Sequence, residues 1–134
     1  MPERIFVDTS AYYALTDARD ANHATAVATA QRLAREGCDL ITTNFVADET
    51  HTLILNRLGR DLAERVLDRL SASSTRILRV TERDETRARE IIHLNQDKDY
   101  SLVDAISFAV MERLHLRHAW TYDHHFTQFG VSQA

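Results

Sequence analysis

The sequence contains few of the residues that mark special classes of protein chain. Among 134 residues there are one cysteine, one proline and three glycines. The lone Cys38 cannot form an intramolecular disulfide, and so little proline and glycine excludes a collagen-like or low-complexity chain. No apolar run reaches the ~18 to 20 residues of a membrane helix, and the N-terminus has no basic and apolar leader. We therefore expect a cytoplasmic protein with no membrane association.

Positive charge is also scarce. The formal net charge is −4, which excludes a protein that binds nucleic acid mainly through a general positive field. Any nucleic-acid site must therefore be local. Lysine is almost absent, since Lys98 is the single lysine among sixteen basic residues. The excess of arginine suits bidentate contacts with phosphate, and biased codon usage explains it equally well.

The pattern that is present is that of an α/β protein. Strand-like apolar runs recur at residues 5–7, 40–42, 77–80 and 118–121, with helix-period segments between them. This alternation predicts a single domain over residues 1–134, with a mainly parallel sheet. Of the predicted helices, one is opened by Asn22 and His23 and stopped by Gly37, one is capped by Asn44 and ends near Gly59, and others cover residues 61–70, 84–94 and 101–112.

The end of the chain is expected to be less regular. Residues 119–126 form a short strand that runs into a polar turn at Asp123. Residues 130–134 either add a short edge strand or fray.

Four acidic residues stand where they could meet. Asp8 follows the first predicted strand and Asp123 follows the last. Glu49 lies about one turn into the helix after the second strand, and Asp104 lies near the start of the apolar helix before the last strand. The carboxyl ends of parallel strands share one edge, where ligands bind, so we expect all four side chains at that edge.

Carboxylates gathered in this way need a positive partner, because burial costs them hydration and they repel one another. The partner could be arginine, a proton or a divalent cation, and only a cation naturally collects three or four oxygen ligands. Taken singly, Asp8 is explained as an N-cap, Glu49 as an exposed helix residue and Asp123 as a turn residue. The apolar surroundings of Asp104 leave it without such an explanation. The joint placement favours a metal site.

These segments resemble the PIN-domain ribonucleases, and within them the VapC toxins of toxin–antitoxin pairs. Residues 5–11, IFVDTSA, are similar to the first motif of that family, and residues 46–50, VADET, to the second acidic position. Residues 99–111 resemble the third motif of one VapC subgroup, and residues 121–126, TYDHHF, the fourth. The resemblance spans the whole chain, with the motifs in the expected order.

The resemblance implies a PIN-like three-layer α/β sandwich that binds Mg²⁺ or Mn²⁺ and cuts single-stranded or looped RNA. It also implies a homodimer that is silenced by a cognate VapB-type antitoxin. In such a family Asp8 and Asp104 would be the most direct metal ligands, and Glu49 and Asp123 would complete the acidic pocket, in part through water. Cleavage would use a metal-activated water to attack a phosphodiester.

Other residues receive smaller expectations. By the same resemblance, Thr9 or Ser10, together with Thr121, would support the pocket with hydroxyl groups, and Asp99 would be a rim residue or a rival ligand. The seven histidines lack the spacing of a zinc site, and His124 and His125, being adjacent, are expected to point apart. His125 fits the fourth motif as a rim or capping residue.

Two functional classes remain open from the sequence. The first is the metal-dependent endoribonuclease. The alternative is a non-catalytic PIN-like module for RNA binding or protein interaction, with the carboxylates kept for packing. A nucleotide-binding Rossmann domain is excluded, because the first predicted strand is followed by Asp8, Thr9 and Ser10 rather than by a glycine-rich turn.

Overall fold

A computed structural model describes residues 2–134 as a single sheet with helices packed against it. Within these residues, no helix combines the length and the apolar character that a membrane crossing requires. The elements in chain order are β1 (Arg4–Val7), α1 (Thr9–Thr16), α2 (His23–Arg35), β2 (Asp39–Thr43), α3 (Asn44–Leu58), α4 (Arg60–Ala72), β3 (Arg76–Leu78), α5 (Glu82–Leu94), α6 (Leu102–Leu114), β4 (His118–Trp120), α7 (His124–Gln128) and β5 (Ser132–Gln133).

The sheet is parallel throughout, with the strand order β3-β2-β1-β4-β5. Strand β1 is central: Ile5 pairs with Leu40 of β2 on one side and with His118 of β4 on the other. The predicted mainly parallel sheet is confirmed. The last residues form the edge strand β5, one of the two outcomes expected for them.

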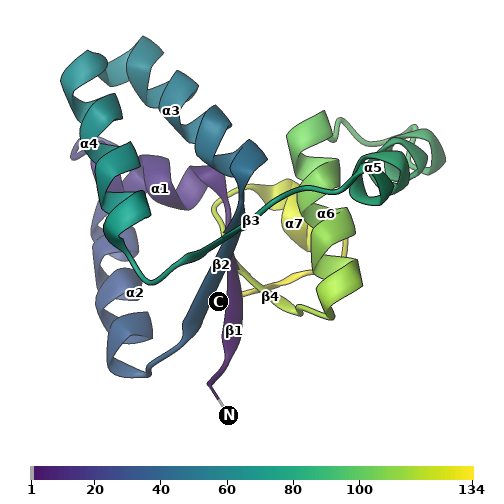
Figure 1. Ribbon diagram of the computed structural model, residues 1–134, viewed down its shortest axis with the longest axis horizontal. Coiled ribbons are helices and arrows are strands. Elements are labelled where there is room, and N and C mark those ends of the chain that lie inside the picture. Colours follow the sequence, from purple (N-terminus) through teal and green to yellow (C-terminus); the bar gives the residue numbers. More distant parts are fainter. Residues whose placement is uncertain (1) are drawn as a thin grey trace.

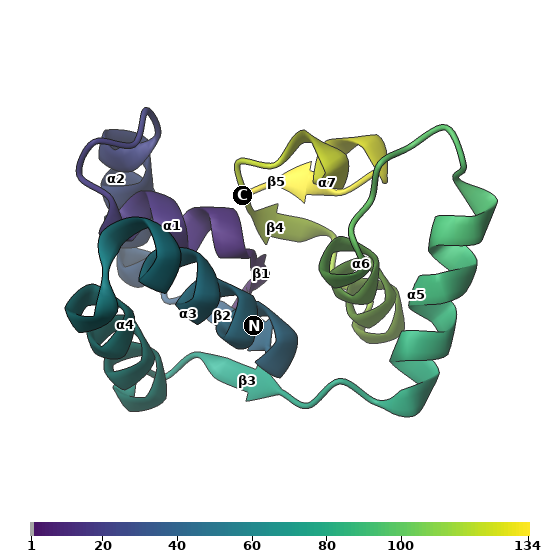
Figure 2. The same ribbon diagram turned by 90° about the horizontal axis from the view of Figure 1, so that it is seen from above.

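Helices cover both faces of the sheet, as predicted. In Figures 1 and 2, α1 to α4 lie on one side of the strands and α5 to α7 on the other. On the α6 side Phe6 of β1 packs with Phe108 and Phe126, and on the opposite side Val7 and Trp120 pack in the cluster that contains α1 and α2 side chains. Alternate residues of β1 thus enter different cores, which fixes its register. The three layers are helix, sheet and helix.

Two short helices were not predicted as such. No range was predicted for helix α1, although Asp8 was considered as an N-cap, and Asp8 does cap α1 by accepting the Ser10 backbone N–H. Helix α7 occupies residues that were predicted to be a polar turn, because Asp123 accepts a hydrogen bond from the backbone N–H of His125 at 2.9 Å and caps the helix. Both helices begin directly after an acidic cap at the carboxyl edge of the sheet.

Several predicted boundaries are corrected. Asn44 does not cap α3: the N-cap is Thr43, whose hydroxyl accepts the Val46 N–H at 3.1 Å, while the Asn44 side chain accepts the Val80 N–H at 2.9 Å. The predicted end at Gly59 is confirmed, and its φ of +99° suits a residue without a side chain. Predicted strands 77–80 and 118–121 are shorter, since pairing ends at Leu78 and Trp120.

Candidate active site

The four acidic residues each lie near the start of a helix at the carboxyl edge of the sheet. Asp8 is the N-cap of α1, after the central strand β1, and Asp123 is the N-cap of α7, after β4. Glu49 is in the second turn of α3, after β2, and Asp104 is in the first turn of α6. The structure places them close enough for their charges to interact: Asp104 raises the pKa of Asp8 and Glu49, and Asp123 raises the pKa of Glu49 and Asp104.

Asp8 is held by two hydroxyl groups. Its Oδ2 atom accepts hydrogen bonds from Ser10 Oγ at 2.7 Å, from Thr121 Oγ1 at 3.0 Å and from the Ser10 backbone N–H at 3.3 Å. Each hydroxyl in turn accepts a backbone N–H from the segment after β4: Ser10 Oγ from Tyr122 at 2.8 Å, and Thr121 Oγ1 from Asp123 at 3.0 Å. The ends of β1 and β4 are therefore joined through one carboxylate oxygen.

Thr9, the other hydroxyl expected to support the pocket, behaves differently. Its side chain lies by Glu49, but its buried Oγ1 makes no hydrogen bond of ordinary geometry with any described residue. Ser10 and Thr121 therefore provide the hydroxyl support. Glu49 itself is half-buried, and the nearby Thr9 hydroxyl lowers its pKa against the larger effect of burial.

Asp104 has a structural role that the sequence interpretation missed. It forms a capping box with Ser101: the Ser101 hydroxyl accepts the Asp104 N–H at 3.0 Å, and Asp104 Oδ2 accepts the Ser101 N–H at 3.2 Å. The view that Asp104 lacked a structural explanation was therefore wrong, because the capping box stabilises the start of α6. The same Oδ2 atom lies 3.0 Å from Nδ1 of His125.

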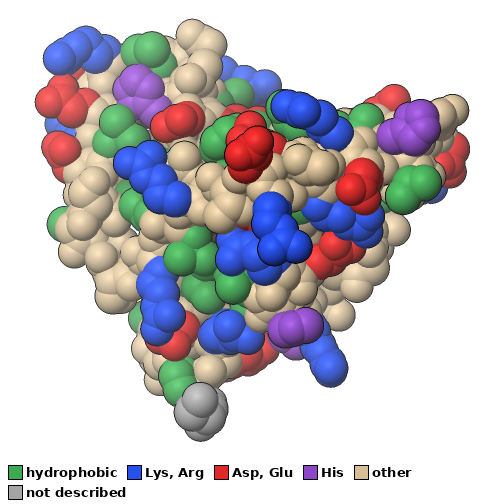
Figure 3. Space-filling view, turned by 45° about the vertical axis from the view of Figure 1, so that its right-hand side comes forward, with side chains coloured by type: hydrophobic (Ala, Val, Ile, Leu, Met, Phe, Trp, Pro, Cys, Tyr) green, Lys and Arg blue, Asp and Glu red, His purple; other side chains and the backbone are tan. Residues whose placement is uncertain are grey.

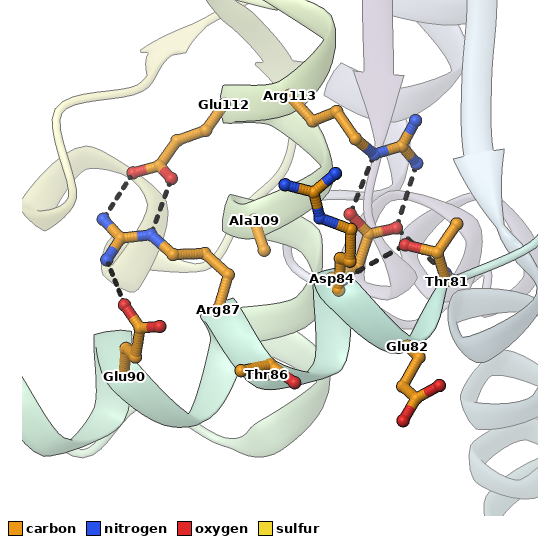
Figure 4. A pocket seen from close by; sticks show the side chains of 10 residues that line it. Thr81, Glu82, Asp84, Thr86, Arg87, Glu90, Ala109, Glu112 and Arg113 are labelled. Atoms are coloured by element: carbon orange, nitrogen blue, oxygen red, sulfur yellow. Dashed lines mark hydrogen bonds and ion pairs between the residues drawn. The ribbon is translucent and has the colours of Figure 1, made fainter.

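An aspartate outside the acidic cluster is neutralised by an arginine. Asp84 forms a capping box with Thr81 at the start of α5 and is 3% exposed, against 8% for Asp104. Figure 4 shows Arg113 facing Asp84, with Nε 2.8 Å from Oδ1 and Nη2 2.9 Å from Oδ2. Both oxygens of Asp84 are thus occupied by one guanidinium. Among the described residues, none of the four acids at the sheet edge has an arginine or lysine within salt-bridge distance.

The pKa values of the acidic residues differ according to whether an arginine neutralises them. Burial raises the pKa of Asp8 to about 6 against the opposing hydrogen bonds of Ser10 and Thr121, and the charge of Asp104 raises it further. Burial also raises the pKa of Asp104, with a contribution from Asp123, and burial raises that of Glu49. Asp84 is the reverse: burial alone would raise its pKa, but Arg113 and Thr81 hold it below the usual range.

His124 and His125 do not point apart as expected. Their ring centroids are 4.4 Å apart, and one ligand atom from each of them and from Asp123 lies within 4.8 Å of the others. His125 faces the acidic cluster with its side chain 18% exposed, so it is more than a rim residue. Asp99, the rival ligand, is exposed in the loop before α6 and is not among the charged groups that shift the pKa of Asp104.

The bonding pattern leaves one oxygen of each aspartate without a protein partner. Asp8 and Asp104 use Oδ2 for their hydrogen bonds, and Asp123 uses Oδ1. For the part of the chain described, no hydrogen bond is made to Asp8 Oδ1, Asp104 Oδ1 or Asp123 Oδ2. Anchored carboxylates with one free oxygen each are a donor set suited to a hard divalent cation.

Basic and acidic side chains are mixed on the face shown in Figure 3. On the face shown in Figure 3, Lys and Arg side chains gather over the middle with acidic side chains beside them. Elsewhere in the structure, arginines are paired with acids, such as Arg87 with Glu112 and Arg113 with Asp84. This mixture agrees with the expectation that a nucleic-acid site must be local.

Comparison with known proteins identifies the fold and close relatives. The PIN domain profile matches residues 5–131. The chain is 37% identical over 127 residues to the 23S rRNA-specific endonuclease VapC20 of Mycobacterium tuberculosis, covering 94% of each chain. The crystal structure of that VapC20, described as a sarcin–ricin-loop-cleaving toxin, matches with a TM-score of 0.85 and 35% identity over 95% of both chains. FitAcB from Neisseria gonorrhoeae shares the fold at a TM-score of 0.68 and 19% identity, covering 96% of this chain and 95% of that one.

Proposed function

Because the chain belongs to the PIN-domain family, we propose that it is a metal-dependent endoribonuclease and the toxin of a toxin–antitoxin pair. The observation that carries the proposal is the cluster of Asp8, Glu49, Asp104 and Asp123, buried or half-buried without an arginine or lysine partner in residues 2–134. The similarity of the chain to a 23S rRNA-specific endonuclease over nearly its whole length supports the same activity.

The residues fit a divalent cation. Asp8 and Asp104 would hold it most directly through their free Oδ1 atoms, with Glu49 and Asp123 completing the pocket. Mg²⁺ or Mn²⁺ suits this all-oxygen set. When bound, the cation lowers the pKa of a water molecule and offsets charge on the phosphate oxygens. The chain's own part is to fix the carboxylates: Ser10 and Thr121 hold Asp8, and the capping box holds Asp104.

The proposed substrate is the sarcin–ricin loop of 23S rRNA, which the names of the VapC20 relatives specify for those proteins. The proposed partners are a VapB-type antitoxin and a second copy of the chain. For the second copy, exposed Leu55 on α3 and Leu67 on α4 supply apolar surface beyond the core. Because the formal net charge is −4, the RNA must be bound locally, near the acidic edge of the sheet. The cation would add positive charge there.

A non-catalytic PIN-like module is the second candidate, and one observation favours it. Asp8, Asp104 and Asp123 all cap helices, so each has a structural reason to be present. Glu49 separates the candidates, because it caps no helix and yet is half-buried among like charges. An ionised carboxylate in such a place is costly unless it binds a cation or takes up a proton.

The experiment incubates the purified protein with 70S ribosomes and with total RNA, in EDTA, Mg²⁺ or Mn²⁺, and maps new 5′ ends. We expect one dominant cut in 23S rRNA that requires metal. Glu49→Gln removes the cut, whereas the matched control Asp48→Asn, at the exposed neighbouring position on α3, retains it. Absence of metal-dependent cleavage of any RNA by wild-type protein would instead favour the non-catalytic module.

A further inference from the structure

His125 links two carboxylates of the acidic cluster. Its backbone N–H donates to Asp123 Oδ1 at 2.9 Å, and its ring Nδ1 lies 3.0 Å from Asp104 Oδ2 and 3.4 Å from Asp123 Oδ1. The ring also packs edge-to-face on Tyr100, with the centroids 5.5 Å apart. The His125 ring therefore contacts one aromatic ring and two acidic side chains, which belong to the starts of two different helices.

The partners of Nδ1 determine where the proton sits. Ionised carboxylates only accept hydrogen bonds, so Nδ1 must be the protonated ring nitrogen when Asp104 is ionised. With the Ser101 N–H, this gives Asp104 Oδ2 two donors and leaves Oδ1 without a hydrogen bond from the described residues. Residues that hydrogen-bond to the ligands of a metal site ordinarily orient those ligands in this way.

We propose that His125 is a positioning residue, whose Nδ1–H holds the Asp104 carboxylate so that Oδ1 faces the cation site. The inference rests on the proposed function for the presence of that site. It differs from the roles expected for a rim or capping residue, because it depends on the side-chain donor and not on the backbone of α7.

The geometry also contains a rival role for His125, which is direct ligation of a cation together with His124 and Asp123. Positioning is favoured because Nδ1 of His125 already faces two carboxylates at hydrogen-bond or near hydrogen-bond distance and would have to give up its proton to bind metal. His124 is three-quarters exposed, and its Nδ1 lies 3.8 Å from Asp123, beyond hydrogen-bond distance. The two roles make opposite demands on Nδ1, which carries a proton in one and binds metal in the other, and they are separable by substitution.

Two substitutions at His125 provide the test. Asn places an N–H at nearly the position of Nδ1 and has no ring nitrogen to bind metal, whereas Phe keeps a ring against Tyr100 and has no donor. We expect His125→Phe to weaken Mn²⁺ binding by about 10- to 100-fold, the usual cost of losing such a support. His125→Asn should stay within about threefold of wild type, as a rescue of the donor. The control pair His93→Asn and His93→Phe, at an exposed position of α5, should change nothing.

Mn²⁺ affinity is measured by titration calorimetry on the whole protein without RNA, and near-ultraviolet circular dichroism checks the fold. Equal affinity for wild type and His125→Phe would overturn the proposal. Equal loss in His125→Asn and His125→Phe would overturn it in favour of direct ligation by a ring nitrogen.

A second readout does not depend on metal. Long-range ¹H–¹⁵N NMR of metal-free protein at pH 8 should show the proton of His125 on Nδ1, and Asp104→Leu should move it to Nε2. A proton on Nε2 in wild type would refute the positioning role even if no metal bound. Failure of wild type to bind Mn²⁺, with the Nδ1 proton present, would count against the proposed function and leave the contact with Asp104 established.

Discussion

Asp84 and Asp104 occupy the same position in two capping boxes, but only Asp84 is paired with an arginine. Each is the third residue of its helix and exchanges hydrogen bonds with the N-cap, Thr81 or Ser101. Arg113 occupies both oxygens of Asp84, while Asp104 keeps Oδ1 free and faces other acids. One carboxylate is bound within the fold, and the other is available to a ligand.

This contrast predicts opposite effects of two identical changes. Asp84→Asn should lower the free energy of unfolding by about 1 to 3 kcal/mol, because it weakens charged hydrogen bonds, and should retain RNA cleavage. Asp104→Asn should abolish cleavage and leave the free energy of unfolding in EDTA equal to or above that of wild type, since it removes repulsion among acids. Urea unfolding and the ribosome cleavage assay measure the two properties. Cleavage by well-folded Asp104→Asn protein would remove Asp104 from the site.

The raised pKa values predict how stability changes with pH in the absence of metal. The pKa of Asp8 is about 6 in the folded protein and 3.8 in the reference state, so the folded protein takes up the proton first. Stability in EDTA should therefore increase as the pH falls from 7 towards 4, with help from Asp104 and Glu49. Asp8→Asn should flatten this increase. Thermal unfolding across the range measures it, and a steady loss of stability from pH 7 to 5 would contradict the assigned environment.

Metal binding should reverse that trend. Protons and cations compete for the same carboxylates, so Mn²⁺ should raise the melting temperature at pH 8 and have little effect at pH 5. At a concentration 100 times the Kd the stabilisation is about 2.7 kcal/mol. Asp8→Asn should lose the shift, and Asp48→Asn, an exposed change on α3, should keep it. An equal shift in wild type and Asp8→Asn would show that the ion binds elsewhere.

Thr121→Val tests the hydroxyl link between β1 and β4. The substitution keeps the side-chain shape but removes the donor to Asp8 Oδ2 and the acceptor for the Asp123 N–H. We expect a loss of about 1 to 3 kcal/mol in the free energy of unfolding, because a partly buried N–H is left without a partner. Mn²⁺ affinity should also fall.

The control for that variant is Thr127→Val. In the wild type the exposed Thr127 hydroxyl donates only to the His124 carbonyl. It should change stability by less than about 0.5 kcal/mol and leave Mn²⁺ affinity unchanged. If Thr121→Val kept wild-type Mn²⁺ affinity, the hydroxyl would serve the fold alone.

The sequence predicts where the acidic residues meet, because the ends of the strands can be recognised from the sequence pattern. An apolar run followed by an acid, as at Asp8 and Asp123, predicts where parallel strands deliver carboxylates. The capping role of Asp104 was also readable, since Ser101 precedes it by three residues, but the apolar residues between them hid the signal. The contact between His125 and Asp104 depends on how α7 packs beside α6, which no local pattern encodes.

The most direct test of the shared cation is anomalous diffraction from crystals of the protein soaked in Mn²⁺. The account predicts a peak within coordination distance of both Asp8 and Asp104, on the side of their Oδ1 atoms. No peak between these carboxylates, or a single peak held by Asp123, His124 and His125 alone, would contradict it.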